Sequence, residues 1–295
     1  MNRSVLNTPW VRLTPPLFVF LWSTGFIVAR YGMPLSPPFK FLELRFLFSI
    51  ACFLPWIYFA KIQWPQERAQ WLHLSVTGLC IQAGYLGGVW VGVKSGIGSG
   101  LTALIVGLQP VLTAFWLSSR RHQITGRQWT GLWLGLGGVI LVLFNKLSVG
   151  IEITTWGFVA EILALLSITV GTLYQKAFVK PCDVRTANTV QLLASAVVTL
   201  PLALLETEAI QWSDQFVFSL AWSVFGLTIG ASSLFYLLIQ KGAASSVTSI
   251  MYLVPPTTAV LAWFLFSESI TFSTILGVAL TALGVSLVVR TPRAI

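Results

Sequence analysis

The chain has 295 residues, of which 56% are hydrophobic and only 9% are charged, whereas an ordinary soluble domain carries roughly 25% charged residues. A water-soluble fold cannot cover that much apolar surface, so the composition excludes a soluble globular protein. The formal net charge of +9 is compatible with nucleic acid binding, but the basic residues follow a different pattern, that of the loops of a membrane protein.

Apolar runs long enough to cross a bilayer as a helix, which takes about 20 residues, recur along the whole chain. In chain order, we expect transmembrane helices at residues 15–34, 38–60, 70–93, 97–118, 127–145, 154–176, 186–205, 215–239, 244–266 and 270–289. The short connections leave no room for a soluble domain. The sequence therefore predicts an all-α membrane protein of ten transmembrane helices, whose function lies inside the bundle.

The basic residues sort by loop. With the N-terminus inside, inner segments hold thirteen of the 18: Arg3, Arg12, Lys61, Arg68, Arg120, Arg121, Arg127, Lys176, Lys180, Arg185, Lys241, Arg290 and Arg293. The outer side holds Arg30, Lys40, Lys94 and Lys146, while Arg45 lies within a span. The positive-inside rule then predicts that both termini lie in the cytoplasm. We expect a multi-pass protein of the bacterial inner membrane. We expect the first span to be retained rather than cleaved as a signal peptide.

Motifs for metal, cofactor or nucleotide chemistry are missing from the sequence. Cys52, Cys80 and Cys182 lack the spacing of zinc ligands, and His73 and His122 lie at span ends. We therefore expect no metal, no cofactor, no catalysis and no nucleic acid partner. The expected partners are the lipid bilayer and a small-molecule substrate.

The two halves of the chain resemble each other. A shift of 146 positions without gaps superimposes residues that apolar helices would not match by chance: Gly25 on Gly171, Ser49 on Ser195, Pro55 on Pro201, Gly84 on Gly230, Gly96 on Gly242, Pro110 on Pro256 and Gly138 on Gly284. Five spans in each half require the second half to enter the membrane in the opposite sense. The sequence thus predicts two inverted five-helix repeats, 1–148 and 149–295, an arrangement typical of alternating-access transporters.

Prolines interrupt the fourth and ninth spans at corresponding positions, Pro110 in one and Pro255 and Pro256 in the other. Proline removes an amide donor, and paired interruptions in a membrane bundle indicate a binding site, although a packing kink is the alternative. Polar residues repeat along one face of each of these helices: Ser99, Thr102, Gln109 and Thr113 in the first, and Ser245, Thr248 and Tyr252 in the second. These stripes either line a cavity or tie helices together.

Charged residues inside spans are functional candidates by default. Glu161 shares a helix face with Thr169 and Thr172, whose counterparts in the first half are Ser23 and Phe26. Arg30, Glu43 and Arg45 lie in the same half of the bilayer, and Glu43 and Arg45 point to different sides of their helix. We take Arg30, Glu43, Arg45 and Glu161 as gate or coupling candidates, with static ion pairs as the alternative.

Aromatic residues lie deep in several spans, where they could surround an apolar or cationic substrate or simply pack in the core. Together with the polar and proline positions, they give the candidate substrate-binding set: Trp22, Ser23, Phe26, Gln82, Tyr85, Trp90, Thr102, Gln109, Pro110, Thr169, Thr172, Tyr236, Thr248, Tyr252, Pro255 and Pro256.

Several segments together resemble the ten-helix EamA-type exporters of the drug/metabolite transporter superfamily. The similar segments are residues 21–26 (LWSTGF), Pro37-Pro38 followed by Arg45, Gln191 with Pro201, and the run from Pro255-Pro256 through Glu268 to Gly277 and Gly284. The resemblance covers nearly the whole chain. It implies a secondary transporter that exports amino acids or other metabolites through a central cavity, with a monomer sufficient for activity.

One position departs from the pattern of this family. Many members carry a glutamate after the fourth span, where this chain has Arg121 and His122. A symmetric pair of loop glutamates is therefore not expected here. The competing interpretations are a channel-like facilitator and, less favoured, a membrane scaffold or enzyme.

Overall fold

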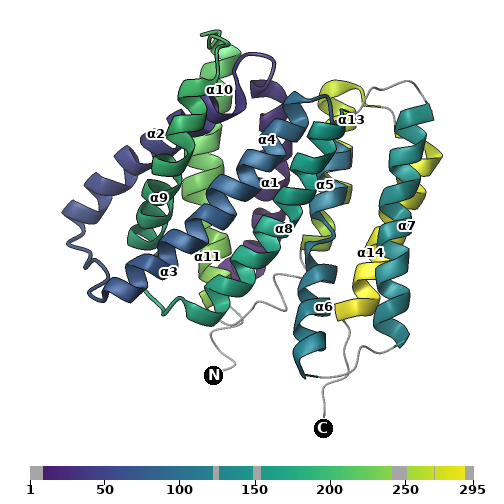
Figure 1. Cartoon of the computed structure of the whole chain (residues 1–295), viewed down its shortest axis with the longest axis horizontal. Coiled ribbons are helices and arrows are strands. Elements are labelled where there is room, and N and C mark those ends of the chain that lie inside the picture. Colours follow the sequence, from purple (N-terminus) through teal and green to yellow (C-terminus); the bar gives the residue numbers. More distant parts are fainter. Residues whose placement is uncertain (1–8, 122–125, 149–153, 241–250, 269, 290–295) are drawn as a thin grey trace.

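The structure is a computed structural model that describes residues 9–121, 126–148, 154–240, 251–268 and 270–289. Its helices, drawn in Figure 1, are α1 (Pro9–Gly32), α2 (Pro38–Phe59), α3 (Arg68–Gly78), η2 (Leu79–Tyr85), α4 (Leu86–Lys94), α5 (Ser99–Val106), α6 (Gln109–Arg121), α7 (Gly126–Ser148), α8 (Thr155–Phe178), α9 (Val184–Leu205), α10 (Asp214–Trp222), η3 (Ser223–Ser232), α11 (Ser233–Gln240), η4 (Met251–Leu253), α13 (Val254–Phe266) and α14 (Phe272–Val289). Helices occupy each of the ten predicted spans, and the described residues form no strand, which confirms the all-α prediction.

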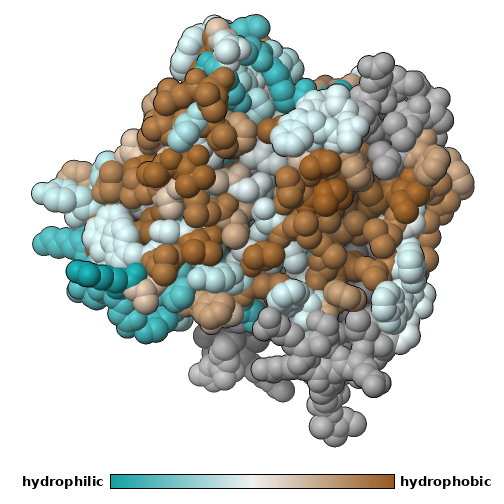
Figure 2. Space-filling view, in the orientation of Figure 1, coloured by the Kyte–Doolittle hydropathy of each residue, from teal (hydrophilic) through white to brown (hydrophobic). Residues whose placement is uncertain are grey.

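Five helical segments are long and apolar enough to cross a membrane: Pro38–Phe59, Arg68–Lys94, Thr155–Phe178, Val184–Leu205 and Asp214–Leu238. Four shorter apolar stretches accompany them, at Ser99–Thr113, Trp129–Val142, Val254–Phe266 and Phe272–Gly284. Figure 2 shows apolar surface across the middle of the molecule, with hydrophilic residues at its upper end and lower left. Large apolar side chains such as Leu205 and Phe264, each 76% exposed, project from the bundle. Lipid is the environment in which this exposure is stable, so the chain is a multi-pass membrane protein.

Two spans contain π-helical segments that the sequence did not predict. Leu79–Tyr85 joins α3 to α4, and Ser223–Ser232 joins α10 to α11. A π-helix bonds residue i to i+5, which widens the helix, and such segments occur frequently at functional sites. Adding 146 to Leu79–Tyr85 gives 225–231, which lies within the second segment. The widening therefore occurs at corresponding positions of the two halves.

The fourth and ninth spans break where the prolines predicted. Helix α5 ends at Val106 and α6 begins at Gln109, so that Pro110 lies in the first turn of α6. The η4 turn ends at Leu253 and α13 begins at Val254, with prolines in its first turn. A Cβ atom built on Gly107 would lie 2.7 Å from Cγ of Pro255, so the two breaks meet inside the bundle.

Helices of the first half pack mainly on helices of the second half. Helix α2 lies beside α9, α4 beside α8, α1 beside α13, and α7 beside α14. The contact between α7 and α14 depends on glycine, because a Cβ atom on Gly138 would meet the carbonyl of Gly277, and one on Gly284 would meet the backbone of Gly131. Such close backbone approach is a common means of association for membrane helices.

The two ends of the bundle differ in their charged residues. We call the end that contains Arg30, Lys94, Glu206, Glu208 and Glu268 the Arg30 side, and the opposite end, where α9 begins, the Cys182 side. There Asp183 caps α9 by accepting a hydrogen bond from the backbone N–H of Arg185 at 2.9 Å. The Arg185 guanidinium also bonds this carboxylate and holds the pKa of Asp183 below its usual value.

Candidate functional site

A small cavity lies inside the bundle between α1, α2, η2, α4 and η3. Its volume is about 40 Å³, which is enough for a few water molecules but far below the roughly 300 Å³ at which ligand pockets begin. Its lining consists of Trp22, Gly25, Phe26, Arg45, Ile81, Gln82, Tyr85, Leu86, Val89, Trp90, Leu227, Ala231 and Ser232. Both π-helical segments contribute to its wall, so the widened turns are at the cavity itself.

Aromatic rings form much of the cavity wall. Trp22 lies 6.1 Å from Tyr85 between ring centroids, with an angle of 6° between the planes, and 4.9 Å from Phe235. Trp90 packs on Phe41 at 4.2 Å. All five rings are at most 8% exposed. Their positions are fixed by mutual contact, which gives a rigid apolar surface for the body of a small molecule.

Among the residues that the structure describes, one charged side chain lines the cavity. Arg45 on α2 is 2% exposed, and its Nε donates to Oγ1 of Thr228 at 3.0 Å. Glu43, two residues earlier, accepts a hydrogen bond from Thr199 on α9 at 2.9 Å. As expected from their spacing, the two residues find partners on different helices. Glu43 therefore ties α2 to α9, whereas Arg45 faces the cavity.

A second hollow, of about 340 Å³, lies one helical turn farther along α1 and α4, toward the Arg30 side. It is lined by Arg30, Met33, Pro34, Val93, Lys94, Gly96, Ile97 and Gly98. On α1, Phe26 lines the cavity and Arg30, four residues later, lines the hollow. On α4, Trp90 lines the cavity and Val93, three residues later, lines the hollow. We call this hollow the vestibule, because it lies on the Arg30 side of the cavity.

An ion pair crosses this vestibule region. The Arg30 guanidinium on α1 pairs with the Glu268 carboxylate, which follows α13, and Ser99 at the start of α5 donates to the same carboxylate at 3.2 Å. Arg30 also lies over the ring of Phe266, 4.8 Å from its centroid. We call Arg30, Ser99 and Glu268 the gate cluster, because their contacts hold α1, the start of α5 and the segment after α13 together beside this hollow.

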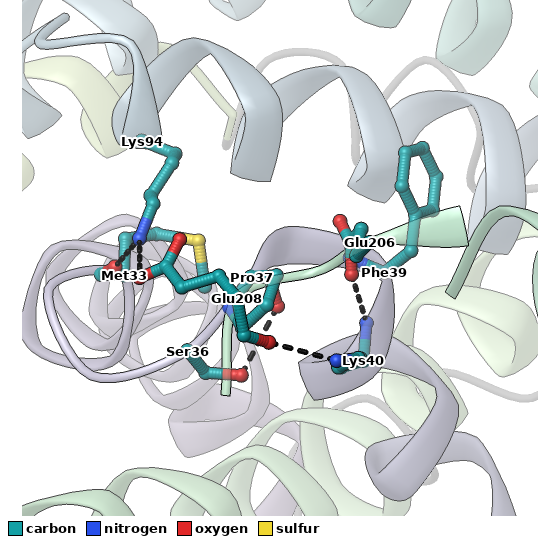
Figure 3. Close-up of polar contacts among 8 residues, drawn as sticks. All are labelled: Met33, Ser36, Pro37, Phe39, Lys40, Lys94, Glu206 and Glu208. Atoms are coloured by element: carbon teal, nitrogen blue, oxygen red, sulfur yellow. Dashed lines mark hydrogen bonds and ion pairs between the residues drawn. The ribbon is translucent and has the colours of Figure 1, made fainter. Parts of the chain in front are cut away.

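A second set of contacts closes the loops on the same side. In Figure 3, Lys94 reaches both the carbonyl of Met33, at 2.9 Å, and the carboxylate of Glu208, at 2.7 Å. The carboxylate of Glu206 accepts hydrogen bonds from the backbone N–H groups of Phe39 and Lys40 at the start of α2 (Figure 3). An acidic group at a helix N-terminus satisfies unpaired donors and complements the helix dipole. Glu206 and Glu208, from the loop before α10, therefore fasten the second half to the first.

The polar stripe of the fourth span ties helices together. Thr102 donates to Oε1 of Glu161 on α8 at 2.7 Å, and Gln109 donates to Thr172, also on α8, at 3.0 Å. Glu161 is fully buried, and its Oε2 atom has no partner within the described segments. A Cβ atom on Gly92 would collide with this carboxyl group, so the absence of a side chain there makes room for it.

The remaining candidates fall into three places. Ser23 donates to the carbonyl of Val254 at 3.4 Å and so joins α1 to the start of α13, beside Pro255 and Pro256. The hydroxyls of Thr169 and Thr172 donate to carbonyls of their own helix. Tyr236 lies on the Cys182 side, with its hydroxyl 3.0 Å from Sγ of Cys182. Thr248 and the side chain of Tyr252 lie outside the described residues.

The structure brings Trp22, Phe26, Gln82, Tyr85 and Trp90 together at the cavity, and adds Arg45, which we had considered for a gate. Sequence reasoning used Gly25 only to align the two halves and to identify the family resemblance, and it missed Leu227 and Ser232, because nothing in their spacing separates them from packing residues. It also missed Glu206 and Glu208. Their position in an acidic loop opposite the basic start of α2 was the available signal.

The described residues contain no group of three or more His, Cys, Asp and Glu side chains that could hold a metal ion. Those residues form instead a buried aromatic cavity lined by the Arg45 guanidinium, with the ion pairs Arg30–Glu268 and Lys94–Glu208 on its Arg30 side. Such an arrangement can bind a small molecule and control its access from one side.

Comparison with known proteins finds relatives that are named as transporters. A transporter of Archaeoglobus fulgidus is 23% identical over 274 residues, covering 92% of this chain and 94% of the relative. The Escherichia coli inner membrane transporter YedA is 26% identical and covers 82% of this chain and 78% of its own. An Escherichia coli protein named "Probable amino-acid metabolite efflux pump" is 26% identical over 164 residues, covering 54% of this chain and 51% of its own.

A solved crystal structure has the same fold, with a TM-score of 0.66, 16% identity, and coverage of 93% of this chain and 94% of the other. The model of the EamA-like transporter family matches two consecutive segments, residues 16–144 and 155–290. These matches cover far more than half of the chain and agree with the resemblance found in the sequence. The chain therefore belongs to the EamA-like transporter family, and it is a membrane transporter.

Proposed function

We propose that this chain is a secondary transporter that exports small metabolites, such as amino acids and related apolar or zwitterionic compounds, by alternating access. The observation that carries this proposal is the buried aromatic cavity between helices of both halves, with an ion-paired vestibule one turn away. At about 40 Å³ the cavity is too small for a metabolite, so substrate binding requires the halves to move apart. The name of the amino-acid metabolite efflux relative supports the substrate class.

Two inverted repeats, 1–148 and 149–295, provide the basis for that movement in our proposal. Support comes from the two matches of one family model, from the π-helical segments at corresponding positions, and from the helix breaks that meet at Gly107 and Pro255. Inverted repeats give one site two nearly equivalent ways to open. In this account, Arg30 and Glu268 close the Arg30 side, and Glu161 is the candidate for coupling to an ion gradient.

The proposed setting is the inner membrane, with both termini in the cytoplasm and the Arg30 side facing outward. The relative YedA is named as an inner membrane transporter. We propose that a monomer suffices, because the cavity and the gate cluster are built from one chain. A channel-like facilitator is the second candidate, and saturable exchange of labelled for unlabelled substrate separates the two, because exchange requires alternating access.

We expect proteoliposomes loaded with a mixed metabolite extract to lose a few compounds selectively, as measured by mass spectrometry against protein-free liposomes. Trp22→Ala should reduce that loss at least about 10-fold, because it removes a main wall of the cavity. Loss of a buried Trp costs roughly 3–5 kcal/mol of stability, so Trp22→Phe, which keeps an aromatic ring, is included as a better-folded variant.

Trp212→Ala is the matched control, because Trp212 is 65% exposed and lies outside the cavity lining. It should transport like the unmodified protein. The amount of folded protein in each sample is measured by size-exclusion chromatography. Equal transport by all four proteins would contradict the placement of the site, and no loss of any compound from vesicles with folded protein would contradict the transport proposal itself.

A further inference from the structure

Arg45 is a buried charge for which the described residues supply no oppositely charged partner. Its side chain is 2% exposed, and within the described segments no carboxylate lies within 4.0 Å of it. Its one hydrogen bond there is from Nε to Thr228. The guanidinium has five N–H donors in a planar fork, so the donors on its two terminal nitrogens remain for a ligand in the cavity that Arg45 lines.

The orientation of this guanidinium is fixed by a residue of the π-helical segment. The Thr228 hydroxyl donates to the carbonyl of Ser223, five residues earlier, at 3.0 Å, and accepts the hydrogen bond from Nε of Arg45. Since the hydroxyl proton is committed to Ser223, its oxygen is held toward Arg45. The π-helical segment thus orients the Arg45 guanidinium through a neutral hydroxyl group and leaves its positive charge uncompensated.

The rest of the cavity favours a particular kind of ligand. Among the described residues, the lining contains one Arg and no Asp or Glu, so the lining itself is positively charged. The Glu161 carboxyl group interacts electrostatically with Tyr85 but does not line the cavity. Trp22, Phe26, Tyr85 and Trp90 offer apolar ring surfaces, and the Gln82 amide, 2% exposed, adds one neutral polar group. A cationic ligand would be repelled there, whereas an anion would offset the cost of the buried guanidinium. A carboxylate matches the guanidinium fork with two parallel hydrogen bonds.

We propose that Arg45 is the carboxylate anchor of this cavity, and that the transporter selects small monocarboxylates whose apolar body packs among the rings. An ammonium group on the same molecule is compatible with the site but is not what the site selects. Amines without a carboxylate are excluded. This inference rests on the proposed transport function and deepens it by naming the group that the substrate must carry.

Three probes of similar shape test the anchor: phenylalanine, 3-phenylpropanoate, which lacks the ammonium group, and phenethylamine, which lacks the carboxylate. Transport of each is measured in proteoliposomes containing the unmodified protein, Arg45→Gln or Arg45→Lys. We expect the unmodified protein to move the two carboxylates at least about 10-fold faster than the amine. Arg45→Gln should lower carboxylate transport by about 10- to 100-fold, and Arg45→Lys, which keeps the charge but not the fork, by less.

Two further variants address orientation and folding. Thr228→Ser keeps the hydroxyl and should stay within about 2-fold, whereas Thr228→Val loses it and should raise the carboxylate KM more than it changes kcat. Lys176→Gln removes an exposed positive charge outside the cavity and is the charge control. If Arg45→Gln does not fold, Arg45→Lys and the two Thr228 variants, together with the probe preference of the unmodified protein, still decide the question.

Equal movement of phenethylamine and the carboxylates by the unmodified protein would overturn the anchor, as would full carboxylate transport by folded Arg45→Gln. Selective export from the metabolite extract of compounds without an acidic group would also overturn it, while leaving the transport proposal intact. If no compound at all moves, the transport proposal fails first and the anchor fails with it.

Discussion

Glu268→Lys should lower substrate exchange at least about 10-fold. The substitution replaces the carboxylate that pairs with Arg30 by a second positive charge, and it removes the acceptor for Ser99. Arg30 and Glu268 have 35% and 16% of their side-chain surface exposed, so solvent reduces the interaction. The expected change in the closing equilibrium is about 2 kcal/mol, which corresponds to roughly 30-fold.

A double variant that exchanges the two charges distinguishes loss of the gate from a local disturbance of folding. Arg30→Glu combined with Glu268→Lys restores an opposite pair in reversed order, and exchange should return to within about 3-fold of the unmodified protein. Exchange is measured as counterflow of labelled substrate in proteoliposomes, with folded protein quantified in each sample. If the double variant is no better than the single one, the ion pair does not act as a gate.

Glu161→Gln should lower substrate accumulation driven by a pH gradient about 10-fold or more. Substrate exchange at equal pH on both sides should stay within about 2-fold of that of the unmodified protein. The carboxyl group is fully buried, with one oxygen bonded to Thr102 at 2.7 Å and the other without a partner among the described residues. Glutamine can keep the bond to Thr102, because its amide oxygen also accepts, but it cannot bind and release a proton. The variant therefore removes the chemistry with little change of shape.

Two controls accompany this experiment, which measures uptake under an imposed pH gradient. Thr102→Val removes the hydrogen bond and keeps the acid, so gradient-driven uptake should persist. Glu67→Gln removes an exposed acid that pairs with Lys180 on the Cys182 side and should behave as the unmodified protein. Gradient-driven uptake that survives in Glu161→Gln would assign this residue to helix packing and leave coupling to another group.

The helices could be predicted from the sequence because each membrane span is a continuous run of apolar residues. A helix in lipid must satisfy its own backbone and expose apolar side chains, so runs of about 20 apolar residues suffice to locate it. The breaks near Pro110 and Pro255 could also be predicted from the local sequence, because proline removes a hydrogen-bond donor from the helix that contains it. The structure has both breaks, at 107–108 and before Val254.

The π-helical segments could not be predicted, because their cause is not in the local sequence. Leu79–Tyr85 and Ser223–Ser232 contain no proline and read as ordinary apolar helix. A π-helical segment differs from an α-helix in which backbone carbonyl each amide N–H bonds to, and that choice depends on packing across the bundle. Their placement around the cavity was therefore invisible until the fold was known.

The sequence also did not predict which side chains contact each other between helices. Arg45 and Arg30 are both arginines in the outer half of their spans, yet Arg45 lines the cavity beside Thr228, whereas Arg30 pairs with Glu268. Gln109 and Tyr236 were both candidates for the substrate site, but the structure places Gln109 against Thr172 and Tyr236 against Cys182. Rotation of each helix about its axis decides these contacts, and an apolar run leaves that rotation open.

The measurement that tests alternating access most directly is the labelling of Ser232→Cys from each side of the membrane. Ser232 lines the cavity, and Cys52, Cys80 and Cys182 are first replaced by serine so that the new thiol alone reacts. An impermeant maleimide is applied to vesicles of both orientations, with and without Glu268→Lys. Our account predicts that the substitution raises labelling from the Arg30 side about 10-fold and lowers it from the Cys182 side by a similar factor. Labelling that rises from one side and stays unchanged from the other would contradict alternating access and favour a channel.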